Sequence, residues 1–170
     1  METTKIQISD AALKAAAEQG MDEFIQVFTD KYLEVLGGEL KAETMGLLNG
    51  CQHSLLGYRF FREEVMDGGF VQLIQNGYGP YIFENPFAKA MRLFGLTDFS
   101  KLIYEAKEIY DKNKEDLTKD RSYDDFMAMY EQYEAFDDLE EAYLDMEEQV
   151  TTLVASYVDN HLELFAKIIK

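Results

Sequence analysis

The sequence predicts an all-α fold, a single-domain bundle of about six to eight helices over residues 1–170. Apolar side chains recur three and four residues apart along most of the chain, and no stretch alternates for long enough to indicate a strand. Glycine and proline separate these periodic stretches at helix-like intervals. The composition, 47% hydrophobic and 14% aromatic, suffices for one sizeable core, and neither an internal repeat nor a linker is visible.

The N-terminal part contains two helices with clear boundary signals. Ser9 can cap a helix over 10–19, and Gly20 ends it. A second helix is expected over 21–36, where the glycine pair at 37–38 ends it.

The middle of the chain is expected to form a long helix followed by a corner. The long helix covers 42–66, although its three glycines lower its helix propensity. A glycine pair at 68–69 then breaks the helix, a short helix follows over 70–76, and 76–80 is a cluster of turn residues.

Two further helices precede the C-terminal part. One covers 86–94 with proline in its first position, and the next runs to Lys112 from a cap at Thr97 or Asp98. A polar loop is expected over 113–121.

The C-terminal part is helical in pattern and strongly acidic. Residues 123–169 follow a helical period, with one interruption expected near 136–138 or 151–152. Residues 122–166 contain 13 Asp and Glu and no Lys or Arg, and residues 122–170 carry −11 of the chain's net charge of −17. Such a surface repels nucleic acid and anionic membranes, so its charge favours a basic protein partner.

On an ideal helix the apolar and acidic side chains of this part separate to opposite sides. The apolar side is formed by Phe136, Leu139, Tyr143, Met146, Val150, Leu153 and Tyr157. The expected partner-binding residues, called the acidic face below, are Glu131, Glu134, Asp137, Asp138, Glu141, Asp145 and Glu148. Without Asp137, the charges of this stripe repeat about every 5 Å, about threefold more sparsely than those of duplex DNA. A homodimer, or the additional acids Asp137, Glu140 and Glu147, would raise this density, whereas the plain alternative is a solvated surface.

Residues 62–72 form the most distinctive segment, in which an apolar helix ends at two glycines and Phe70 anchors a short helix. Gln72 and Asn76 lie on one face of that helix, where their amides are expected to bond free backbone groups of the turn. The segment is interpreted as a packing corner, with a ligand site as the alternative. Its residues are Glu64, Gly68, Gly69, Phe70, Gln72, Asn76 and Gly79.

This segment resembles a motif of the DNA mimic proteins, a bacterial family of acidic all-helical proteins also described as a domain of unknown function. The family pattern reads Glu-Val-x-Asn-Gly-Gly-Phe-x-Gln, followed by an Asn and a Gly. The chain departs from it at Asp67, where Asn is usual. It matches at Glu64, Val65, Gly68, Gly69, Phe70, Gln72, Asn76 and Gly79. The resemblance covers roughly 50–165 and is less clear over the N-terminal helices of 1–41.

The resemblance implies a helical homodimer whose carboxylates imitate DNA phosphates and occupy the DNA-binding surface of a basic protein, such as a transcription repressor. One alternative is an immunity-type inhibitor of a basic nuclease. Another is a helical scaffold or small-ligand module centred on the corner at 68–70, in which acidity serves solubility alone.

Catalytic chemistry has little support in the sequence. The two histidines, His53 and His161, form no Glu-x-x-His pair, and Cys51 lies on a different side of a helix from His53. No phosphate-binding loop, nucleophile elbow or dinucleotide fingerprint occurs, although a glycosidase-like acid pair has no fixed spacing. We therefore expect no enzyme, and no catalytic, metal or cofactor-binding residue. With one cysteine, no leader pattern and no membrane-length apolar run, a soluble cytoplasmic protein is expected.

Overall fold

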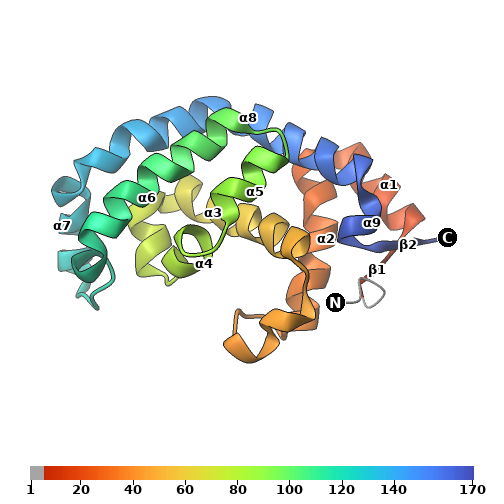
Figure 1. The fold of residues 1–170 in the computed structure, drawn as a ribbon, viewed down its shortest axis with the longest axis horizontal. Helices are drawn as coiled ribbons and strands as arrows, with labels where there is room; N and C mark the ends of the chain where they lie inside the picture. Colours follow the sequence, from red (N-terminus) through yellow and green to blue (C-terminus); the bar gives the residue numbers. More distant parts are fainter. Residues whose placement is uncertain (1–5) are drawn as a thin grey trace. The chain divides into compact units, whose positions relative to one another are not determined.

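The computed structural model describes residues 6–170, so the first five residues of the expected 1–170 domain lie outside the described residues. Helices make up most of the described chain, which confirms the predicted all-α class (Figure 1). Within residues 6–170, no helix combines the length and the apolar character needed to cross a membrane.

The chain divides into two compact units, which are described separately. Unit 1 contains the chain up to Arg59 together with Gln149–Lys170, and unit 2 contains Phe60–Glu148. Helices α3 (Gly50–Gln75) and α8 (Asp137–Asn160) contribute residues to both units. The single domain expected over 1–170 therefore stays a prediction.

The first two helices of unit 1 have the predicted boundaries. α1 (Asp10–Gln19) begins where the Ser9 hydroxyl accepts a hydrogen bond from the Ala12 amide at 3.1 Å. α2 (Met21–Leu36) ends at a glycine with a left-handed backbone, φ 82°. Local capping chemistry is sufficient to fix both helices.

The third predicted helix starts later than expected. Residues Ala42–Leu47 form a 3₁₀ helix, η2, and α3 begins only at Gly50. The reason is a reciprocal cap: the Gln52 amide donates to the Asn49 side chain at 2.8 Å, and the Asn49 amide donates to the Gln52 side chain at 2.9 Å. This pair satisfies two free backbone donors and fixes the helix start.

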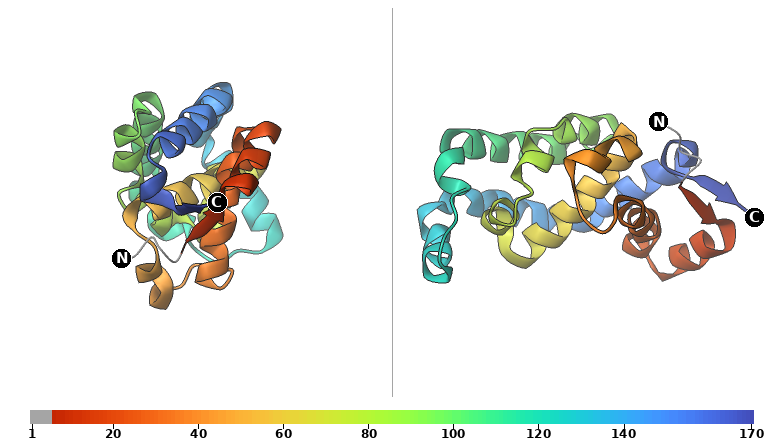
Figure 2. Two further views of the ribbon diagram at one scale, coloured as in Figure 1. Left: turned by 90° about the vertical axis from the view of Figure 1, so that its right-hand side faces the viewer. Right: turned by 90° about the horizontal axis from the view of Figure 1, so that it is seen from below.

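The expectation of helix up to residue 169 and of no strand is wrong at the two ends of the described chain. After the short helix α9 (Leu162–Phe165), strand β2 (Lys167–Ile169) pairs in parallel with β1 (Gln7–Ser9), and Figure 2 shows the two strands side by side. Ile8 of β1 is buried. Each strand has three residues, which is too short for a detectable alternation, and the pairing joins segments far apart in the sequence.

Unit 2 surrounds a cluster of aromatic side chains. Phe61 packs with its ring centroid 5.6 Å from that of Phe70, 5.2 Å from that of Phe99 and 4.9 Å from that of Tyr143. All four rings are buried, which gives the unit a dense core. The remaining elements of unit 2 are α4 (Gly79–Phe83), α5 (Phe87–Leu93), α6 (Thr97–Leu117), α7 (Tyr123–Gln132) and η3 (Glu134–Phe136).

α6 is five residues longer than predicted, because Leu117 is fully buried and continues its apolar side. The polar loop expected over 113–121 is correspondingly short.

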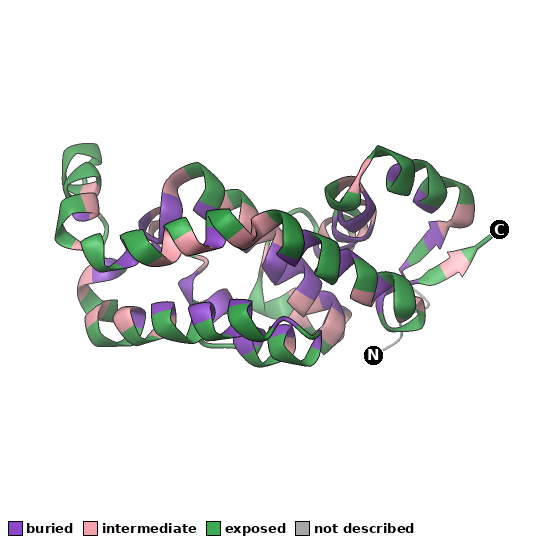
Figure 3. Cartoon of the chain, turned by 90° about the horizontal axis from the view of Figure 1, so that it is seen from above, coloured by how far each residue is buried: buried purple, intermediate pink, exposed green. Residues whose placement is uncertain are grey.

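The apolar side of α8 also differs from the prediction in its last turns, where Leu153 is 40% exposed and Val154 is buried. The last turns of α8 belong to unit 1, whereas its first turns belong to unit 2. The side of the helix that is buried in the last turns is therefore determined by residues of unit 1. Figure 3 shows exposed and buried residues alternating along the long helices.

Candidate protein-binding face

The acidic face lies within unit 2, on three successive elements. Glu131 is on α7 and Glu134 is on η3, because the chain leaves the helix at Tyr133. The predicted interruption is thus present slightly earlier than expected, so Glu131 and Glu134 lie outside the helix that carries the other five residues. All seven side chains of the face are exposed. The five on α8, called the outward row below, are Asp137, Asp138, Glu141, Asp145 and Glu148.

The outward row is a regular linear array. At 100° per residue its five positions fall within an arc of about 100°, on the side of α8 opposite the buried Tyr143. It extends about 16 Å along the helix, which corresponds to one charge per ~4 Å. A single DNA strand carries one phosphate charge per ~3.4 Å of axis. The row therefore approximates the charge density of one strand.

Two further acids of α8 point inward. The Phe70 amide donates to the Glu140 carboxylate at 2.8 Å, and Arg62 Nε donates to the Glu147 carboxylate at 2.9 Å. The expectation that these acids raise the density of the external array is therefore wrong. Both lie one turn from Tyr143, at the i−3 and i+4 positions, so the helical phase already contained the signal that separates them from the row.

Glu140 links α8 to the glycine corner. Gly69 adopts φ 75° and ψ −171°, a conformation essentially restricted to glycine, and interrupts α3 there. The Phe70 amide that follows the break starts a new helical segment, so the Glu140 carboxylate acts as its cap. Burial raises the pKa of this carboxyl, Asp137 raises it further, and the Phe70 amide opposes the shift.

The corner itself is filled by protein atoms. Phe70 is fully buried and stacks on Phe136 with ring centroids 5.1 Å apart. A side chain on Gly79 would meet the Tyr110 ring, so glycine permits close packing there. These contacts support the interpretation of the motif as a packing corner.

The amides of the corner bond carboxylates, which corrects the expectation that they bond backbone groups. Gln72 donates to Asp67 at 3.0 Å, and Asn76 donates to Glu64 at 2.5 Å. The motif's departure at Asp67 therefore places a carboxylate where Gln72 can donate to it.

Two tyrosines hold α7 and the start of η3 against the rest of unit 2. The Tyr130 hydroxyl donates to the Gly68 carbonyl at 2.8 Å, and the Tyr133 hydroxyl donates to the Asp116 carboxylate. The bond from Tyr133 is the main cause that lowers the pKa of Asp116, and Arg121 adds to it. Besides the predicted residues, α7 carries exposed Asp124 and Asp125 in its first turn.

No group of three or more His, Cys, Asp or Glu side chains within residues 6–170 is arranged to hold a metal ion. The face consists of carboxylates directed to solvent. Its chemistry is that of a set of hydrogen-bond acceptors for cationic side chains.

Comparison with known proteins places these features in a family. The model of the family described as "DMP19-like protein" matches residues 46–161, which include the corner and the acidic face. The DNA mimic protein DMP19 of Neisseria meningitidis serogroup B is 32% identical over 127 residues, which cover 74% of this chain and 77% of that protein.

Proposed function

Because this chain belongs to the DMP19-like protein family, we propose that it acts as a DNA mimic that occupies the nucleic-acid-binding surface of a basic protein, such as a transcription repressor. The outward row carries the proposal. It presents five exposed carboxylates at nearly the charge spacing of a DNA strand, in a segment without Lys or Arg from 122 to 166.

The proposed mechanism is competitive occupancy. Carboxylates of the acidic face replace phosphates as acceptors for the partner's Lys and Arg, and the negative field of the chain steers the partner towards it. A bound partner is removed from nucleic acid by mass action. A homodimer would supply a second row and so approach the charge density of both strands. We propose transcription regulation in the cytoplasm as the setting of this mechanism.

The test is capture of partners on immobilised protein from a lysate of the cells that natively produce it. The variant that breaks the row combines Asp138→Asn, Glu141→Gln, Asp145→Asn and Glu148→Gln. The matched control removes four exposed charges from unit 1 with Glu34→Gln, Glu39→Gln, Glu43→Gln and Glu163→Gln. Captured proteins are identified by mass spectrometry at low and at moderate salt.

We expect the unmodified chain and the control to retain a basic DNA-binding protein that duplex DNA displaces, and the row variant to lose it. Equal retention by all three proteins would exclude the row as the binding surface. Retention of a protein that degrades nucleic acid would instead identify a nuclease inhibitor, which uses the same electrostatics. A ligand module at the corner has no support from the geometry, because Phe70 is buried and the Gln72 and Asn76 amides are bonded.

A further inference from the structure

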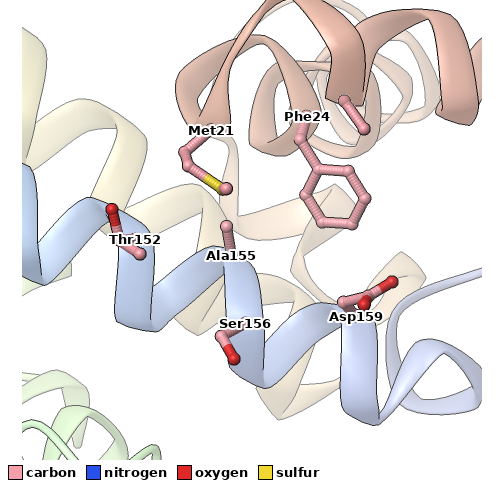
Figure 4. A pocket seen from close by; sticks show the side chains of 7 residues that line it. Met21, Phe24, Thr152, Ala155, Ser156 and Asp159 are labelled. Carbon is pink, nitrogen blue, oxygen red and sulfur yellow. The ribbon is translucent and has the colours of Figure 1, made fainter.

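Unit 1 contains a groove that the acidic face does not use. It lies between the α1–α2 pair and α8, and its volume is about 310 Å³. Figure 4 shows Met21 and Phe24 directed towards α8, with Ala155 directed towards them. Its lining residues are Ala17, Met21, Phe24, Thr152, Ala155, Ser156 and Asp159.

The floor of this groove is apolar. Phe24 and Ala155 are buried, whereas Met21, which also lines the groove, is 46% exposed. A large exposed methionine beside a groove is typical of adaptable binding surfaces, since its flexible side chain fits varied apolar groups. The volume is within the usual range of small binding sites and suffices for one long side chain.

The charge around the groove has one sign. Asp159 lines it, and exposed Glu18 and Asp22 each follow a lining residue in sequence. Among residues 6–170, no Lys or Arg lines it. The nearby cation on α1, Lys14, forms an ion pair with Asp10 at 3.0 Å. A ligand with an apolar stem and a positive end fits this combination of apolar floor and anionic rim.

We propose that this groove binds a lysine or arginine side chain, with an apolar neighbour, from a segment of a protein partner. The aliphatic stem contacts Met21 and Phe24, and the cationic end lies at Asp159, where the Ser156 and Thr152 hydroxyls add acceptors. This inference is independent of the proposed function, because none of its residues belongs to the acidic face.

The experiment uses the full chain labelled with ¹³C at methionine methyl groups, and the Met21 signal is assigned through Met21→Leu. Three probes of equal length are titrated: hexylammonium, hexanol and hexanoate. We expect hexylammonium to shift the Met21 signal saturably, at least about threefold more tightly than hexanol, and hexanoate to produce no saturable shift. The absence of a saturable shift with hexylammonium up to about 50 mM, or equal binding of hexanol, would overturn the proposal.

The role of Asp159 is tested with Asp159→Asn, and Asp120→Asn removes one exposed charge from unit 2, outside the acidic face, as the matched control. The preference for hexylammonium over hexanol should vanish in the first variant and persist in the second. Persistence in both would exclude Asp159 as the recognition group.

A capped peptide, Ala-Leu-Lys-Leu-Ala, distinguishes a protein segment from a free amine. Its leucines add contacts at Met21, so it should bind at least about threefold more tightly than hexylammonium. Equal affinity of the two probes would contradict a protein segment as the occupant and indicate a small amine.

Discussion

Both sides of α8 carry acidic residues, but the acids of one side face solvent and those of the other side contact the rest of unit 2. On one side, Asp138, Glu141 and their neighbours in the outward row are exposed and directed to solvent. On the other side, Glu140 accepts the Phe70 amide and Glu147 binds Arg62 within unit 2. The acids of this helix therefore cannot be treated as one charged surface.

This difference shows how an acidic array can be held in place. Like charges three and four residues apart weaken a helix by about 0.2–0.5 kcal/mol per pair, and the outward row contains several such pairs. The inward acids attach α8 to α3 at two points about two turns apart, at the glycine corner and at Arg62. We infer that the inward contacts offset the repulsion that the outward row creates.

The largest expected effect comes from Gly69→Ala, which disrupts the contact between Glu140 and the glycine corner. Alanine at φ 75° and ψ −171° is strained, and its Cβ would collide with the Glu140 carboxylate. We expect the free energy of unfolding to fall by about 3 kcal/mol or more in urea denaturation. Gly77→Ala is the control, since Gly77 has φ 91° but no atom within 4 Å of an added Cβ. Equal losses in the two variants would mean that the Glu140 contact contributes nothing.

A smaller loss is expected from Glu147→Gln. Its side chain is 12% exposed and its carboxylate is bonded to Arg62, so removal of the charge weakens a partly buried ion pair. The free energy of unfolding should fall by about 1–2 kcal/mol. Glu148→Gln, one residue away in the outward row, should change it by less than ~0.5 kcal/mol. If the two neighbouring variants lose equal stability, the inward and outward distinction fails.

Glu140→Gln should change the pH dependence of stability. The folded carboxyl has a raised pKa, so the folded state binds its proton more tightly and this residue's contribution to stability falls as pH rises. The fall begins near the ordinary glutamate pKa of about 4.3 and ends above the raised value. The free energy of unfolding, measured from acidic to neutral pH, should therefore decline less with pH in the variant. Identical profiles for the variant and the unmodified chain would contradict this role of Glu140.

The smallest effect on stability is expected from the fourfold neutralisation of the outward row. The removal of like-charge repulsion should leave the free energy of unfolding unchanged or raise it by up to about 1 kcal/mol. Urea denaturation and circular dichroism measure this directly. A large loss of stability or helicity would show that the outward acids contribute to folding, as the inward acids do.

Helices with local signals were predictable from the sequence. Ser9, Gly20 and Gly37 fix α1 and α2 through their own capping chemistry, and the predicted boundaries are confirmed. The break at Gly69 was predicted for the same reason. Non-local features escaped the prediction, because the β1–β2 pairing depends on contacts between distant parts of the chain.

The candidate site was predictable to a similar extent. Exposure of the outward row follows from helical phase alone. The contacts of Glu140 and Glu147 depend on partners in α3, far away in the sequence, so the sequence analysis did not predict that these acids point inward. Their positions one turn from Tyr143 would have indicated that they flank the buried side.

The most direct test of the central claim is the salt dependence of binding between this chain and the DNA-binding protein it captures. A mimic that replaces phosphates should lose affinity steeply as salt rises, and the fourfold neutralised row should bind at least about 100-fold more weakly at low salt with a shallower slope. The control variant, in which four exposed acids of unit 1 are neutralised, should keep nearly the same affinity and the same salt slope as the unmodified chain. If the row variant keeps the affinity and the salt slope of the unmodified chain, the outward row is solvated surface and the partner binds elsewhere.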